Sequence, residues 1–274
     1  MVTNHSTIGN LLEVRELRKS YQRAAGAFSK NGAGPRLTAV DGVSFAVLAG
    51  ETFAIVGESG CGKTTLARML LRLIEPDSGE IQFDGVDILA LAGAALRSRR
   101  RQMQMIFQDP FASLNPRKRV SEIVGEPLAI HEPNLSGRER RERAAAMLKR
   151  VGLDEDFAKR YPHEFSGGQR QRIGIARALI LRPKLVVADE PVSALDVSVG
   201  AQVLLLLQEL QVEFGLTYIF ISHSLPVVAQ VASRVAVMRA GQFVESGAVE
   251  QILHQPANDY TRELLAAVPE LPKD

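Results

Sequence analysis

The stretch Gly57-Glu58-Ser59-Gly60-Cys61-Gly62-Lys63-Thr64-Thr65 decides the fold of this chain. It lies between an apolar run, Phe53 to Val56, and a helix-like segment, Leu66 to Leu71. The glycines let the backbone curl into a nest of inward N–H groups, and the following helix adds its positive dipole end. We expect Lys63 to reach the β- and γ-phosphates and the Thr64 hydroxyl to coordinate magnesium. The alternative is a glycine turn that precedes a lysine by chance. It does not explain why a strand-like run and a helix-like segment flank the stretch. The stretch therefore predicts a nucleoside triphosphate site.

Composition sets broad limits on the class of protein. The 274 residues are 46% hydrophobic, which is enough for a full α/β core and an insertion. A net charge of +2, from 33 basic and 31 acidic residues, does not indicate a nucleic-acid partner. Cys61 is the single cysteine, so the chain has no internal disulfide and no cysteine-based metal cluster. The first residues lack a signal pattern, and the apolar run Val203 to Leu207 is too short for a bilayer. We therefore expect any membrane role to depend on partner subunits.

The N-terminal segment has the pattern of a small antiparallel sheet beside the nucleotide. Leu11 to Tyr21 alternates as a strand, although Leu17 is one step out of phase. Ala24 to Pro35 is expected to form a long hairpin loop, and Leu37 to Val47 resumes the strand pattern with Asp41-Gly42 as a tight turn. Tyr21 is the aromatic residue expected to stack on adenine. The alternative is an edge-strand tyrosine that covers the core.

After the phosphate loop, another predicted strand ends in a polar amide. Gln102 to Phe107 reads as a strand, and Gln108 follows it. Because ligands of α/β sheets bind at the carboxyl ends of strands, we expect Gln108 to point into the ligand crevice. Val120 to about Tyr161 then has a helical pattern. The mixed charges from Arg138 to Arg143 are interpreted as a solvated helix face and not as a nucleic-acid site.

A second glycine-rich junction, Ser166-Gly167-Gly168-Gln169, precedes a predicted helix from Arg170 to Ile180. By the same dipole argument it is a second anion site. One nucleotide cannot easily occupy both junctions of one monomer if they lie on separate subdomains. We therefore expect a dimer in which this junction caps the partner's γ-phosphate. On its own, Ser-Gly-Gly is a common flexible turn.

Two carboxylates end a continuous apolar strand, Leu185 to Ala188, which is typical of a buried parallel sheet. Side chains alternate along a strand, so Asp189 and Glu190 are expected to point in different directions. Asp189 would serve the magnesium ion, and Glu190 would face the attacking water. A second buried strand, Thr217 to Ile221, leads to His223 at the same predicted edge, where the imidazole is expected to donate to the γ-phosphate.

In this order the motifs resemble those of the nucleotide-binding subunit of an ATP-binding cassette transporter, over nearly the whole chain. The resemblance implies the following parts: Gly57 to Thr65 as Walker A loop, Gln108 as Q-loop glutamine, Ser166 to Gln169 as signature motif, Asp189 as Walker B aspartate, Glu190 as catalytic base, Asp196 in the D-loop and His223 as switch histidine. The chain departs from the usual family pattern at Phe165, where leucine is commoner, and at Ser224, where aspartate is commoner.

A finer resemblance is to the oligopeptide, dipeptide and nickel importer ATPases. It rests on the segments Phe107 to Arg117, Tyr161 to Phe165 and Tyr260 to Arg262. It implies a second ATPase subunit, identical or homologous, two transmembrane permease subunits, an extracytoplasmic solute-binding protein, and a peripheral place on the cytoplasmic face of the membrane. Some members carry a C-terminal iron–sulfur cluster, which we do not expect here because the cysteines are missing.

The predicted fold is α/β: a P-loop NTPase core with a mostly parallel sheet, an N-terminal antiparallel β-subdomain and an inserted helical subdomain at about 95–165. One domain is expected over 11–268, with tails at 1–10 and 269–274. The predicted function is ATP hydrolysis that powers solute import, of di- or oligopeptides above all. Import of nickel or another small solute is an alternative. A soluble cassette ATPase is less favoured because the chain shows no internal repeat or coiled-coil insertion, and a P-loop kinase or GTPase does not explain the Ser166 junction or His223.

In the predicted mechanism, ATP closes an ATPase dimer and hydrolysis reopens it. Glu190 acts as the base, Lys63 and His223 neutralise the γ-phosphate, and Gln108 links the nucleotide to the helical subdomain. Thr64, Gln108 and Asp189 are the expected Mg²⁺ ligands. Cys61 is expected to be a small loop residue whose thiolate is favoured by Lys63 and the helix N-terminus.

Overall fold

The computed structural model describes residues 9–22 and 36–267, so the predicted loop at 24–35 lies outside the described residues. The described residues form two compact units. Unit 1 comprises residues 9–22, 36–91 and 222–267, and unit 2 comprises residues 92–221. The single-domain limits given above stay a prediction.

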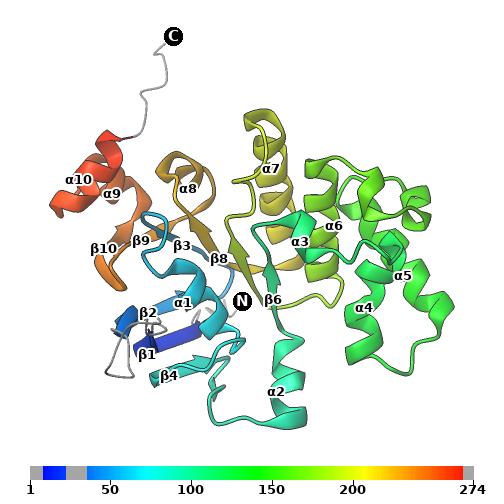
Figure 1. Ribbon diagram of the computed structural model, residues 1–274, viewed down its shortest axis with the longest axis horizontal. Coiled ribbons are helices and arrows are strands. Elements are labelled where there is room, and N and C mark those ends of the chain that lie inside the picture. The colour runs from blue at the N-terminus through cyan, green and yellow to red at the C-terminus, as the bar shows by residue number, and fades with distance from the viewer. Residues whose placement is uncertain (1–8, 23–35, 268–274) are drawn as a thin grey trace, which may run out of the picture. The chain divides into compact units, whose positions relative to one another are not determined.

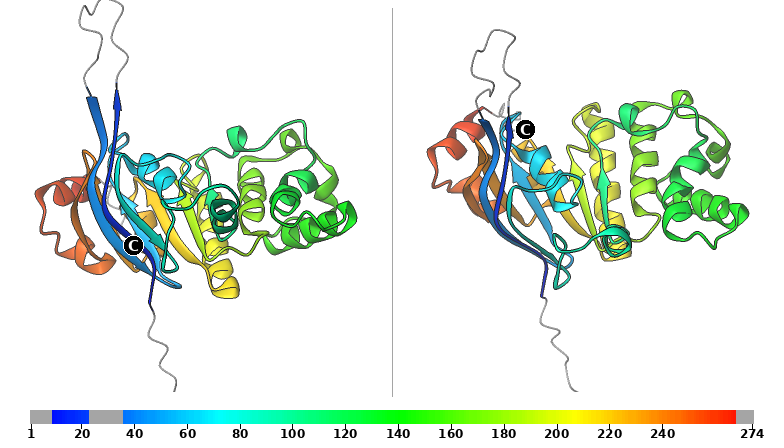
Figure 2. Two further views of the ribbon diagram at one scale, coloured as in Figure 1. Left: turned by 90° about the horizontal axis from the view of Figure 1, so that it is seen from below. Right: turned by 60° about the horizontal axis from the view of Figure 1, so that its bottom comes forward.

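An antiparallel sheet with the strand order β2-β1-β4-β5 forms one layer of unit 1. Its members are β1 (Asn10–Gln22), β2 (Arg36–Leu48), β4 (Ser78–Phe83) and β5 (Val86–Asp87). Figure 2 shows β1 and β2 as long strands that lie side by side. The predicted antiparallel subdomain is thus confirmed.

A bulge in β1 explains why Leu17 is out of phase. The register shifts between Val14 and Leu17, and Glu16 between them has a left-handed φ of 46°. An extra residue returns the next side chain to the original face of the sheet. Leu17 is therefore fully buried, as Leu12 and Val14 are.

The predicted tight turn at Asp41-Gly42 is wrong, because β2 runs through it without a break. Gly42 has a φ of 69°, and the β1–β2 register shifts where Val43 pairs with Leu17 and Val40 with Lys19. Asp-Gly supplies the positive φ that either a turn or a bulge requires, so the dipeptide alone does not distinguish them.

The rest of unit 1 surrounds β3 (Thr52–Val56), which pairs in parallel with β9 (Arg234–Arg239). β10 (Gln242–Ala248) pairs antiparallel with β9 through Ala240 and Gly241, whose φ values of 47° and 85° fit a tight hairpin turn. The helices of unit 1 are α1 (Lys63–Leu70), α8 (Leu225–Val231), α9 (Val249–His254) and α10 (Asp259–Ala266).

Unit 2 contains three parallel strands that are almost wholly buried. β7 (Leu185–Asp189) pairs with β6 (Met103–Ile106) on one side and β8 (Thr217–Ser222) on the other. Buried parallel strands carry continuous apolar runs, and this pattern predicted β7 and β8. β6 was predicted as a strand that ends in a polar amide, and its sequence includes Gln104.

Helices make up the rest of unit 2, and α4 and α5 lie beside α6 in Figure 1. They are α2 (Gly93–Arg100), α3 (Pro110–Ser113), α4 (Val120–His131), α5 (Gly137–Arg150), α6 (Gly167–Leu179) and α7 (Val197–Phe214), with 3₁₀ turns at Glu155–Lys159 and Pro162–Glu164.

Within the described part of the chain, α7 is the one helix long and apolar enough to span a membrane by length and composition. It packs against α6 and buries Val203, Leu206 and Leu207. A core helix passes the same test, so this feature is weak evidence for a span.

Candidate functional site

The phosphate loop connects β3 to α1 in unit 1, and neighbouring backbones hold it closely. A Cβ atom at Gly57 would lie 2.1 Å from the carbonyl oxygen of Met238 in β9. One at Gly62, whose φ is 115°, would lie 2.0 Å from the carbonyl oxygen of Ala39 in β2. The Gly241 N–H also donates to the Cys61 carbonyl at 2.9 Å. Glycine is thus required by close packing as well as by the curl of the loop.

Lys63 is the first residue of α1 and is buried, with 5% of its surface exposed. Its Nζ donates to the carbonyl oxygens of Gly57 at 2.7 Å and Glu58 at 2.8 Å. The structure thus places the ammonium group at the centre of the loop. Its predicted reach to the phosphates of a bound nucleotide stays a prediction.

The N-terminus of α1 has no side-chain cap. Gly62 is its N-cap residue, in a left-handed conformation, and Thr64 and Thr65 stand half-buried in its first turn. An N-terminus without a capping side chain offers backbone N–H groups and a positive dipole to an anion. This is the local geometry that the sequence predicted for phosphate binding.

Tyr260 of α10 contacts the phosphate loop and was not assigned to the site from the sequence. The Glu58 N–H donates to the Tyr260 hydroxyl at 3.2 Å, and the Arg239 guanidinium lies 4.5 Å from the centre of the ring. Tyr260 is buried, and burial raises the pKa of its hydroxyl. Its place in the importer-like tail was the one sequence signal. Because Tyr260 and Glu58 are 202 positions apart in the chain, local sequence patterns could not predict this contact.

The expectation that the Cys61 thiolate is favoured is wrong in sign. Burial raises the pKa of the Cys61 thiol, and the nearby Lys63, whose Nζ is 3.9 Å from Sγ, only partly opposes this shift. Desolvation penalises the charged form, and here it outweighs the Coulomb attraction. Cys61 should therefore be less reactive than an ordinary thiol.

Tyr21 and His223 belong to the same unit as the phosphate loop. Tyr21 lies near the end of β1 with 38% of its surface exposed, and the Lys19 Nζ lies 5.7 Å from its ring centre. His223 follows β8 and is exposed. Ser224 begins α8 without a side-chain capping bond, and its N–H donates to the Ser222 hydroxyl at 3.0 Å. Adenine stacking and phosphate contact stay predictions for these residues.

In unit 2, two of the predicted site residues meet at the carboxyl ends of β6 and β7. The Gln108 Nε2 donates to the Glu190 carboxylate at 3.0 Å. A glutamine that donates through its amide nitrogen keeps its amide oxygen as an acceptor or ligand. This contact joins residues 82 positions apart in the chain, as expected for adjacent parallel strands.

Glu190 lies just beyond β7 and has a left-handed φ of 46°. The Glu190 N–H donates to the Ile221 carbonyl at 3.0 Å, and the Glu190 carbonyl accepts from the Ser193 hydroxyl at 3.1 Å. This conformation costs a non-glycine residue about 1–2 kcal/mol. Because Glu190 lies outside β7 and has a left-handed backbone, strand alternation does not set the direction of its side chain. Asp189 is still in the strand and is buried, with 3% exposed.

The Ser166 junction differs from the predicted loop because α6 begins at Gly167, not at Arg170. Gly167, Gly168 and Gln169 form its first turn. The Ser166 hydroxyl accepts from the Gln169 N–H at 3.4 Å, and the Gln169 side chain accepts from the Ser166 N–H at 3.0 Å. This reciprocal capping box was present in the sequence as Ser-x-x-Gln.

The start of α7 packs against the start of α6. A Cβ atom at Gly168 would lie 2.3 Å from Cγ1 of Val199, so the helices approach closely at this point. Asp196 caps α7, because its carboxylate accepts from the Val199 N–H and the Ser198 hydroxyl, both at 2.9 Å. The Val199 N–H is the main cause of the lowered pKa of Asp196.

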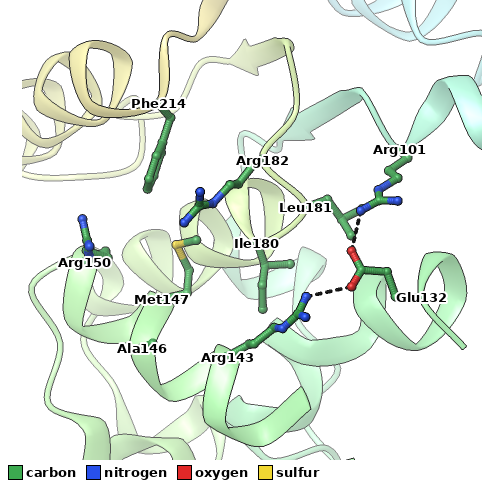
Figure 3. Close-up of a pocket in the computed structure, with 10 residues that line it drawn as sticks. All are labelled: Arg101, Glu132, Arg143, Ala146, Met147, Arg150, Ile180, Leu181, Arg182 and Phe214. Carbon is green, nitrogen blue, oxygen red and sulfur yellow. Dashed lines mark hydrogen bonds and ion pairs between the residues drawn. The ribbon is translucent and has the colours of Figure 1, made fainter. Parts of the chain in front are cut away.

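A pocket of about 440 Å³ lies at the other edge of the unit 2 strands (Figure 3). Its residues Arg101 and Arg182 precede β6 and β7, whereas Gln108 and Glu190 follow them. Arg101 and Arg143 both pair with Glu132, and Arg150 pairs with Glu213 outside the pocket. These pairs and the helix C-termini that converge here account for the basic lining.

The predicted site residues thus fall into two sets. Unit 1 carries Tyr21, the phosphate loop from Gly57 to Thr65, and His223; unit 2 carries Gln108, Ser166 to Gln169, Asp189, Glu190 and Asp196. No cluster of three or more His, Cys, Asp or Glu side chains suited to a metal occurs within residues 9–22 and 36–267.

Comparisons with known proteins identify the family. Residues 40–193 match the family described as ABC transporter. The oligopeptide transport ATP-binding protein AppF of Bacillus subtilis (strain 168) is 52% identical over 260 residues, covering 94% of this chain and 78% of AppF. The dipeptide transport ATP-binding protein DppF of Escherichia coli (strain K12) is 50% identical over 276 aligned positions, covering 100% of this chain and 81% of DppF.

A solved structure agrees with these relatives. The dimeric post-hydrolysis state of the ATP-binding cassette MJ0796, bound to ADP and Pi, has a TM-score of 0.76 at 31% identity, covering 87% of this chain and 98% of that chain. The chain therefore belongs to the ABC transporter family and is one of its ATPases. The predicted α/β fold and the resemblance to peptide importer ATPases are confirmed. The roles of single site residues stay predictions.

Proposed function

We propose that this chain is the ATPase subunit of a di- or oligopeptide importer in the bacterial cytoplasmic membrane. The observation that carries this proposal is the 50% identity with a dipeptide transport ATP-binding protein along the whole chain. AppF, named for oligopeptide transport, supports the same solute class. A soluble cassette ATPase or a nickel importer is not favoured by these relatives.

In the proposed reaction, Glu190 takes a proton from the attacking water, and Gln108 orients the Glu190 carboxylate through their 3.0 Å hydrogen bond. Lys63 and His223 neutralise charge on the γ-phosphate. His223 and the phosphate loop belong to unit 1, and Gln108 and Glu190 belong to unit 2.

Mg²⁺ fits the donor chemistry of Thr64, Gln108 and Asp189, which offer a hydroxyl, an amide and a carboxylate. Hard oxygen ligands are those that Mg²⁺ prefers, and the hydrogen bond to Glu190 uses only the amide nitrogen of Gln108. A bound Mg²⁺ would neutralise charge on the β- and γ-phosphates.

The proposed partners are a second ATPase subunit, two permease subunits and an extracytoplasmic binding protein. The dimeric state of the MJ0796 cassette supports the first of these. The assembly would hold this chain peripherally on the cytoplasmic face of the membrane. The second ATPase would place its Ser166 region, or the equivalent, on the nucleotide of this chain.

Glu190→Gln tests the chemistry. The amide keeps the size of the side chain but removes the base, so hydrolysis should fall by about 10²–10⁴-fold while ATP still binds. An ATP-bound dimer should accumulate, which size-exclusion chromatography with light scattering would detect. Wild-type hydrolysis by Glu190→Gln would refute the assigned base. Stimulation of ATPase activity by a dipeptide and its binding protein, in the reconstituted transporter, tests the solute class.

A further inference from the structure

Arg177 of α6 has a chemical environment that the reaction above does not explain. Its Nη1 donates to the carbonyl oxygen of Ser113 at 2.5 Å, and its guanidinium carbon lies 5.7 Å from the ring centre of Phe107. The side chain is half-buried, and burial is the main reason why the pKa of Arg177 is lowered. No ion pair of Arg177 with a carboxylate occurs among the described residues. Arg177 is thus a partly desolvated cation whose described contacts are a backbone carbonyl and an aromatic ring, and the charge of Glu126 only partly opposes the lowering of its pKa.

The two groups that Arg177 contacts lie on either side of Gln108. Phe107 immediately precedes Gln108, and Ser113 ends α3, which begins two residues after it. A cation over an aromatic ring within about 6 Å is attracted to the ring face, and the C-terminal carbonyls of a helix attract cations. One planar guanidinium therefore holds both ends of the segment Phe107–Ser113.

We propose that Arg177 is a positioning residue that fixes the segment Phe107–Ser113 on α6 and so orients Gln108 toward Glu190. The effect reaches the proposed base through the hydrogen bond from Gln108 to Glu190 at 3.0 Å. Arg177 lies about three helical turns from Ser166, so α6 connects its capped N-terminus to the Gln108 segment. The proposal rests on the proposed function for the role of Glu190.

The same helix provides a matched control. The Arg172 Nη1 donates to the carbonyl oxygen of Val151 at 2.8 Å, at the C-terminal end of α5. Arg172 thus makes the same kind of bond between α6 and a helix C-terminus but does not contact the Gln108 segment. A general loss of α6 packing should affect Arg172→Met and Arg177→Met alike. Only Arg177→Met should affect Gln108.

A fluorescence experiment tests the contact without ATP hydrolysis. The chain has no tryptophan, so Phe107→Trp introduces a single reporter under the Arg177 guanidinium. Adding Arg177→Met should shift its emission to longer wavelength and increase its quenching by acrylamide. Adding Arg172→Met should leave both unchanged. Equal responses to the two substitutions, or none to Arg177→Met, would overturn the proposal.

A kinetic cycle tests the consequence. Arg177→Met should lower kcat by up to about 10²-fold with little change in the KM for ATP, because misplacement acts on the chemical step. In a Gln108→Ala background the same substitution should lower the residual kcat no further. Arg177→Lys keeps the charge but not the planar stack, so it should retain part of the activity. It also serves as a second test if Arg177→Met fails to fold.

The two proposals fail in different ways. Fully additive losses in the Arg177 and Gln108 cycle would overturn the positioning role even if Glu190 is the base. Wild-type hydrolysis by Glu190→Gln would refute the base, while the fluorescence response would still report whether Arg177 holds the segment.

Discussion

The glycine-rich junctions that precede α1 and α6 have similar sequences but different structures. Before α1, Gly57 and Gly62 lie against neighbouring backbone carbonyls, and no side chain caps the helix. At the start of α6, Gly167 and Gly168 are helical, and Ser166 and Gln169 cap the helix reciprocally. At the first junction the backbone N–H groups of the helix N-terminus stay available to an anion. At the second junction the side chains of Ser166 and Gln169 already accept hydrogen bonds from some of these N–H groups. A glycine count alone therefore does not identify a phosphate cradle.

The strongest test of this comparison is a pair of alanine substitutions in the phosphate loop. Gly62→Ala adds a Cβ atom 2.0 Å from the Ala39 carbonyl oxygen at a φ of 115°, so strain and clash together should cost about 3 kcal/mol or more. At Gly60, with a φ of 81°, an added Cβ would meet no atom within 4 Å, and Gly60→Ala should cost only about 1–2 kcal/mol. Urea unfolding measures both, and equal costs would contradict the role of close packing.

A second pair probes the glycines of α6. Gly168→Ala would press on Val199 and should destabilise unit 2 by about 1–3 kcal/mol. Gly174, in the same helix, has no neighbouring atom within 4 Å of an added Cβ. Gly174→Ala should therefore be neutral or stabilise the chain by up to about 1 kcal/mol. Thermal unfolding distinguishes the two, and a stabilising Gly168→Ala would show that the helix starts are not in close contact.

The capping box gives a smaller effect and separates stability from function. Ser166→Ala removes a helix cap and should cost about 1 kcal/mol. Ser136→Ala removes the equivalent cap of α5, where the Ser136 hydroxyl accepts from the Glu139 N–H at 3.2 Å, and should cost the same. If Ser166 also acts on a partner's nucleotide, only Ser166→Ala should lower steady-state hydrolysis. Equal activities would limit Ser166 to a structural role.

The smallest expected effect concerns the electrostatics at the uncapped end of α1. Burial raises the Cys61 pKa, so the thiolate should form only at higher pH than in the unfolded chain. Rates of iodoacetamide labelling across pH, in buffer and in urea, measure this shift at the only thiol. The midpoint should be higher in the folded protein. A lower midpoint would mean that Lys63 and the helix dipole outweigh desolvation.

Local patterns predicted much of the site because each depends on neighbours in the chain. The strand, loop and helix around Lys63, the buried run before Asp189 and the amide at Gln108 are all read over a few residues. The predictions that were wrong concern features that depend on residues distant in the sequence. Asp41-Gly42 became a bulge because β1 continues beside β2, and the sign of the Cys61 pKa shift depends on burial by the fold.

By itself, the sequence determined the family, the ATPase activity and the order of the elements, because phosphate loops and buried strands are short-range patterns. The tertiary structure alone decided what lies against these elements. It brought the Tyr260 hydroxyl to the Glu58 N–H, the Gln108 amide to Glu190 and the Arg177 guanidinium to Phe107 and Ser113. Such contacts join residues 64 to 202 positions apart, and only the packing of the folded chain specifies them.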